Sequence, residues 1–151
     1  MADSKSIEEA AKDVQYEVNM CFKALELYRR YTFCQPISDG TCMDSHIDGR
    51  LFFEAFLIHF RCLIYFFQDR PDDRDVLVSH FLNPINLQDT VKTLVEYKDR
   101  LDKLLAHVTF ARQTFEMSWD EDRMARDLRC TWDAFIKALP EKHRGLFQAF
   151  G

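Results

Sequence analysis

The sequence predicts an all-α fold, namely an antiparallel four-to-five-helix bundle with short connecting helices, on three observations. Apolar residues recur at three- and four-residue spacing through most of the chain. Ser-x-x-Glu capping boxes at residues 6–9 and 118–121 are typical of helix starts. The segment 75–82 has strand propensity but no second strand to pair with, so we expect a short helix there.

We expect one domain over residues 1–151, because a chain of 151 residues with 47% hydrophobic content is long enough for a single core. Its 25 acidic and 20 basic side chains argue against a general attraction to nucleic acid or anionic lipid. Five scattered cysteines without a Cys-x-x-Cys pair, and a start without an apolar signal region, predict a reduced cytoplasmic protein.

A long amphipathic helix is predicted from about residue 7 to residue 31. Its apolar side chains share one face: Ile7, Ala11, Val14, Val18, Cys21, Leu25 and Tyr28. Residues 33–45 follow, and we expect them to form a loop because they contain Pro36 and the turn-forming pair Asp39-Gly40.

The next helix, over residues 47–68, is apolar almost throughout and ends before Pro71. Glu54, His59 and Arg61 fall inside its apolar run, and charged side chains are costly at the centre of a bilayer. We therefore expect the central core helix of the bundle and no membrane span.

The second half of the chain predicts a helix over about residues 86–115, with its apolar side chains on one face. A further helix follows the capping box at 118–121 and runs to Pro140. A last short amphipathic helix is expected to contain Leu146, Phe147 and Phe150.

Two ionisable residues of the apolar helix, Glu54 and Arg61, lie seven residues apart on one face. They are too far apart to pair with each other easily, so each is expected to find a partner on another helix. The candidate partners are Asp75, Asp99, Asp102 and Arg112. His59 lies on the other side of the helix, where it is either a neutral core histidine bonded to one partner or a functional histidine.

A second group of charged residues lies on the helix predicted over 86–115. Arg100, Lys103, His107 and Phe110 share the flank opposite its apolar stripe. That flank is either a solvated face or an interface, and the aromatic Phe110 favours an interface. Arg112 lies near the centre of the apolar stripe, either buried or in the last turn with its charge reaching water.

No cofactor or metal site is expected. The His-Glu-x-x-His motif, zinc spacings, a paired Glu-x-x-His di-iron signature and the calcium loop are all absent from the sequence. Glycine-rich phosphate loops and the nucleophile elbow of hydrolases are also absent. These absences remove support for ordinary hydrolase and metal chemistry.

Arg100, six intervening residues and His107 match the Arg-x(4–6)-His signature of HEPN domains, so the chain resembles these small helical bundles. The resemblance implies a dimer that cleaves RNA without metal, with Arg100 stabilising phosphate charge and His107 transferring protons. Residues 56–61 and 104–112 also look like segments of small uncharacterised bacterial helical proteins.

Three hypotheses follow. The first is a bacterial helical domain that binds another protein chain, foremost itself as a homodimer, through the Arg100, Lys103, His107 and Phe110 flank. The alternative is a HEPN-like ribonuclease or nucleotide-binding domain using Arg100 and His107. The second alternative is a small anionic ligand bound in the bundle core near His59 and Arg61.

Overall fold

The computed structural model describes residues 4–33, 42–69, 76–105 and 119–149. Within these ranges the chain forms helices joined by turns and contains no strand, which confirms the all-α fold class. The helices pack around one continuous core of buried apolar side chains.

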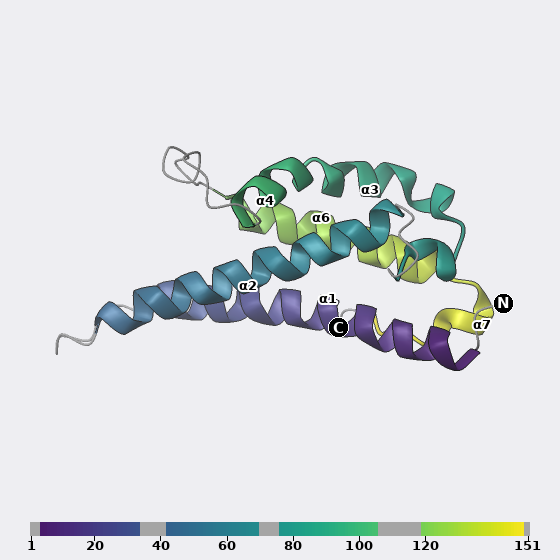
Figure 1. The fold of residues 1–151 in the computed structure, drawn as a ribbon, viewed down its shortest axis with the longest axis horizontal. Coiled ribbons are helices and arrows are strands. Elements are labelled where there is room, and N and C mark those ends of the chain that lie inside the picture. Colours follow the sequence, from purple (N-terminus) through teal and green to yellow (C-terminus); the bar gives the residue numbers. More distant parts are fainter. Residues whose placement is uncertain (1–3, 34–41, 70–75, 106–118, 150–151) are drawn as a thin grey trace.

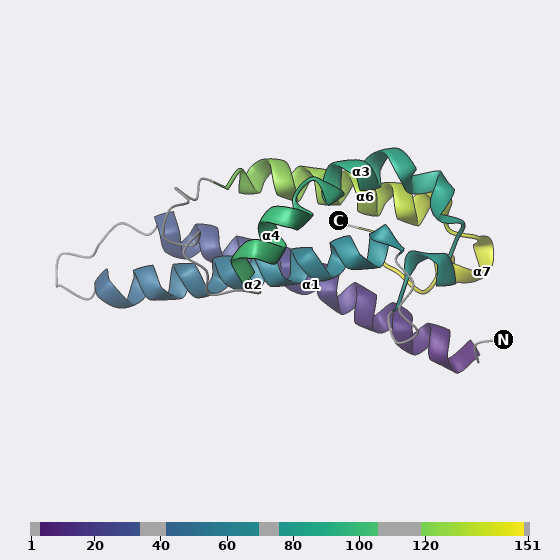
Figure 2. The ribbon, with the colours of Figure 1, turned by 45° about the horizontal axis from the view of Figure 1, so that its top comes forward.

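The two longest helices are α1 (Ser4–Phe33) and α2 (Cys42–Gln68), and they lie side by side as a hairpin (Figures 1 and 2). The predicted face of α1 is buried, with Val18 and Cys21 fully enclosed. On α2 the buried side chains are larger, and Phe56 and Phe60 have no exposed surface. The loop predicted over residues 33–45 is too long, because α2 already begins at Cys42.

The rest of the chain packs on this hairpin. Two short 3-10 turns, η1 (Val78–His80) and η2 (Pro84–Leu87), lead into α3 (Gln88–Val95) and α4 (Lys98–Leu105). Both α3 and α4 contact α2, and α3 also packs on α6 (Glu121–Ala138) (Figures 1 and 2). The last short helix is α7 (Glu141–Arg144). It does not contain Leu146 and Phe147, as the sequence predicted, because it ends before them.

An aromatic cluster holds the C-terminal part of the chain on the core. Its rings meet mostly edge to face, with centroids 4.9–6.4 Å apart, and they belong to Phe66, Phe67, Phe81, Trp132, Phe135 and Phe147. The indole N–H of Trp132 donates to the backbone oxygen of Gln148, 3.1 Å away. The cluster thus satisfies its buried polar group while burying large apolar surfaces.

Both predicted capping boxes are wrong. The first would start a helix after Ser6, but α1 is already helical at Ser4. The second would start a helix after Ser118, which lies outside the described residues, but the N-cap of α6 is Asp120. The Asp120 carboxylate accepts a hydrogen bond from the backbone N–H of Arg123 and so caps the helix two residues later than predicted.

The continuous helix predicted over 86–115 is also wrong, because a turn at Glu96 and Tyr97 separates α3 from α4. The backbone N–H of Tyr97 bonds to the oxygen of Leu94, three residues back, which tightens the chain there. The Tyr97 hydroxyl donates to Asp127 on α6 at 2.7 Å, and its ring packs edge-on against Phe60 of α2. Tyr97 therefore fixes the bend by which α4 reaches α2.

Replacing Tyr97 with Phe tests this role. Burial and the Asp127 hydrogen bond raise the pKa of Tyr97 from its ordinary value to about 12. The hydroxyl therefore stabilises the fold below its unfolded pKa of about 10, and the contribution is lost as the pH rises towards the folded value. We expect Tyr97→Phe to lower the unfolding free energy by about 1–2 kcal/mol at neutral pH.

The measurement is urea unfolding at neutral pH, combined with a titration of phenolate absorbance. The variant should lack the tyrosine ionisation with a pKa of about 12. Exposed Tyr16 offers the control, since Tyr16→Phe removes a hydroxyl away from the bend and is expected to leave stability unchanged. Equal stability of Tyr97→Phe and the parent would contradict the role of this hydrogen bond.

Candidate functional site

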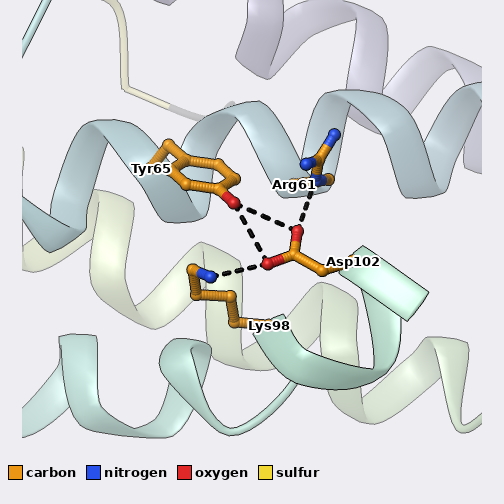
Figure 3. Close-up of polar contacts among 4 residues, drawn as sticks. All are labelled: Arg61, Tyr65, Lys98 and Asp102. Atoms are coloured by element: carbon orange, nitrogen blue, oxygen red, sulfur yellow. Dashed lines mark hydrogen bonds and ion pairs between the residues drawn. The ribbon is translucent and has the colours of Figure 1, made fainter. Parts of the chain in front are cut away.

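A four-residue polar network joins α2 to α4, with the carboxylate of Asp102 at its centre (Figure 3). The Asp102 oxygens lie 2.6 Å from Arg61 Nε and 2.6 Å from Lys98 Nζ. The Tyr65 hydroxyl is 3.1 Å from each of the two oxygens. Arg61 and Tyr65 come from successive turns of α2 and face Lys98 and Asp102 on α4. The sequence-based expectation that Arg61 finds a partner on another helix is confirmed, and of the four candidates Asp102 is that partner.

The network holds one negative and two positive charges around an aromatic ring. The Lys98 ammonium and the Arg61 guanidinium lie 5.0 and 5.2 Å from the centre of the Tyr65 ring. Partial burial alone would raise the pKa of Asp102, but hydrogen bonds from Lys98, Arg61 and Tyr65 outweigh burial and lower it. The Asp102 hydrogen bond in turn raises the pKa values of Arg61 and Lys98.

On its other side, α2 is tied to α1 through His59. The His59 Nδ1 atom lies 2.8 Å from a carboxylate oxygen of Glu17, and the ring of Tyr16 meets the imidazole edge-on. His59 was expected to bond to one partner, and this partner is the side chain of Glu17 on α1. Polar contacts therefore hold α2 from both sides, through Glu17 on one and Asp102 on the other.

The flank predicted around Arg100 is divided in the structure. The Arg100 guanidinium lies over the indole of buried Trp119, 3.9 Å from the ring centre, while Lys103 is exposed. The other residues predicted for this region, His107, Phe110 and Arg112, lie outside the described residues. Of the predicted flank, the described residues therefore include only Arg100 and Lys103, and the predicted Arg100–His107 pair lies partly outside them.

One face of α2 is open to solvent although this helix is the most apolar of the described helices. Leu51 and Ile58 are 57% and 49% exposed, Cys62 is exposed, and Ala55 between them is half-buried. We call Leu51, Ala55, Ile58 and Cys62 the α2 stripe. Glu54 and Arg61 border it on one side. The expectation that α2 is a core helix thus describes only its other face.

The spacing of the stripe residues is present in the sequence, but the other apolar residues of α2 conceal it. Its residues follow one another at spacings of four, three and four, while Phe53, Phe56 and Phe60 occupy the opposite face. By length and composition, the segment Gly49–Gln68 is also apolar enough to cross a membrane, and 39% of its apolar window is buried. The exposed stripe contributes to this high hydropathy.

A cavity of about 350 Å³ adjoins the network and is lined by Arg61, Cys62, Tyr65, Phe66, Val76 and Leu77. Within the described chain, this cavity has an arginine in its lining, as the hypothesis of an anionic ligand requires. Among the described residues, no group of three or more His, Cys, Asp or Glu side chains is arranged to hold a metal ion.

Comparisons of the chain with protein-family models, with curated proteins and with solved structures find no match.

Replacing Asp102 with Asn tests the network as a clamp between α2 and α4. The two cations would then face each other without a counter-charge, and we expect a loss of about 1–3 kcal/mol in unfolding free energy at neutral pH. Because the folded pKa of Asp102 is lowered, its contribution is present above the unfolded pKa of about 4 and is lost as the pH falls through the folded value.

The measurement is urea unfolding of parent and variant at a series of pH values. The difference between them should be constant near neutrality and shrink below pH of about 4. Asp99→Asn is the matched control, because Asp99 is an exposed carboxylate on the same helix. A difference that persists unchanged in acid would show that the lost carboxylate charge is not what stabilises the fold.

Proposed function

We propose that this chain is a helical domain that acts by binding another protein chain, foremost a copy of itself, through the α2 stripe. The observation that carries the proposal is the exposure of Leu51 and Ile58 on the most apolar helix that the structure describes. A row of apolar side chains left in water along one face of a helix is typical of interaction surfaces.

The surroundings of the stripe also support an interface. Protein interfaces commonly have an apolar centre and a charged rim, and here Glu54 and Arg61 lie along one edge of the apolar residues. The Asp102 and Glu17 contacts hold α2 from either side. A surface fixed in advance loses less conformational entropy when it binds.

The other hypotheses draw less support from the described contacts. As a ribonuclease residue, Arg100 would have to leave the Trp119 ring to reach a phosphate. As an anion-binding residue, Arg61 would have to share its charge with Asp102. We also propose that the whole chain is an antiparallel four-to-five-helix bundle and that the protein is cytoplasmic.

Replacing Ile58 with Asp tests the proposal. The substitution places a charge at the middle of the stripe in both copies of a dimer, so we expect association to weaken at least about tenfold. The measurement is sedimentation equilibrium of the parent and the variant over a wide concentration range. Circular dichroism establishes that the variant keeps its helical content.

Ile85→Asp is the matched control. Ile85 is even more exposed, at 69%, but lies in η2 and outside the stripe, so its replacement should leave association unchanged. A parent protein that stays monomeric at every concentration would contradict self-association. Equal effects of the two substitutions would contradict the assignment of the surface to α2.

A further inference from the structure

The α2 stripe has the spacing of a coiled-coil seam. Leu51, Ala55, Ile58 and Cys62 alternate steps of four and three residues, which keeps them along one line on a helix that supercoils with another. Large and small side chains alternate along this line. A second helix laid on it would therefore find a small residue beside each large one.

We infer that the occupant of the stripe is α2 of a second copy of this chain, running antiparallel about a two-fold axis; the inference rests on the proposed function. In a two-fold pair each contact occurs twice with the roles exchanged. If Ala55 lies opposite Ile58 of the second copy, the same register places Leu51 opposite Cys62. Every layer of the seam then joins one large and one small side chain.

The charges bordering the stripe select the same register. Glu54 and Arg61 each directly precede a small seam residue, Ala55 and Cys62, so they occupy equivalent flanking positions. In antiparallel helix pairs such equivalent positions face each other, and charges there set partner and orientation. Glu54 of each copy then meets Arg61 of the other, which yields two ion pairs.

Arg61 is able to make this contact while it binds Asp102. Its Nε donates to Asp102 at 2.6 Å, and a guanidinium carries five N–H donors in all. Its side chain is about one third exposed, so part of the guanidinium is still open to a second chain. Glu54 is exposed on the same edge.

A parallel pairing fits less well. It would align each seam residue with its own copy, so that Ile58 meets Ile58 and Ala55 meets Ala55, leaving alternate crowded and empty layers. It would also bring Glu54 towards the position of His59, which is already bound by the carboxylate of Glu17. The antiparallel arrangement avoids both costs.

Disulfide mapping tests the orientation. Under mild oxidation we expect L51C to form a covalent dimer through Cys62 of the second copy, identified as a crosslinked peptide by mass spectrometry. Within one chain the two positions are eleven residues apart on a continuous helix, about 16 Å, so this bond cannot form internally. The control L51C/C62S should lack the crosslink.

The variant I58C distinguishes the parallel arrangement. In a parallel pair, I58C would bridge to its own copy readily, whereas the antiparallel register places Ala55 opposite it. A strong bridge between the two I58C positions, together with no L51C–Cys62 crosslink, would overturn the inference.

Charge exchange gives a second, reversible test. We expect E54R and R61E each to weaken self-association about tenfold, because two ion pairs become two like-charge pairs. An equimolar mixture of the two variants should recover the parent's affinity as a heterodimer, since one copy then carries two positive and the other two negative charges. Two folded variants that show no recovery when mixed would overturn the inference.

Since R61E also loses its bond to Asp102, circular dichroism must show that it folds, and the disulfide mapping decides the orientation if it does not. The outcomes separate the two proposals. A monomeric parent contradicts the proposed self-association itself. A parent that associates and responds to Ile58→Asp, but gives no L51C–Cys62 crosslink, contradicts only the antiparallel arrangement.

Discussion

The ion pair between Asp102 and Arg61 is the contact on which the exposed surface of this protein depends. A partly buried carboxylate is costly unless donors surround it, and Asp102 has three, from Arg61, Tyr65 and Lys98. These donors lie on both α2 and α4, so satisfying the carboxylate requires the two helices to stay together. The network thereby fixes α4 beside α2. Its residue Arg61 borders the α2 stripe.

The bend at Tyr97 makes this ion pair possible. A straight continuation of α3 would keep following α6, whereas the turn at Glu96 and Tyr97 redirects the chain towards α2. Tyr97 contacts both partners at once, through its hydroxyl to Asp127 and its ring to Phe60. One side chain therefore couples the packing of α6 to the position of the polar network.

The sequence was enough to predict what depends on local pattern and on charge balance. It indicated the all-α class, the α1 and α2 helices, and a partner for Arg61 on another helix, with Asp102 among the candidates, because a charge in an apolar helix needs a partner. It did not indicate the bend, since Leu94 and Leu101 keep their helical spacing across it and both are fully buried. The α2 stripe was not predicted, because a helix with apolar residues on all sides is expected to be buried on all sides.

Under the proposed self-association, a helix and not a lipid bilayer would cover the exposed apolar residues of α2. Entry into lipid would take Arg61 and His59 to the middle of an apolar phase, each at a cost of a few kcal/mol. Their partners Asp102 and Glu17 lie on other helices, so those charges would have to enter too or lose their contacts. In the proposed dimer, a second α2 would cover Leu51 and Ile58 and leave both polar contacts intact. It would also bring Glu54 of each copy to Arg61 of the other, a contact that lipid does not offer.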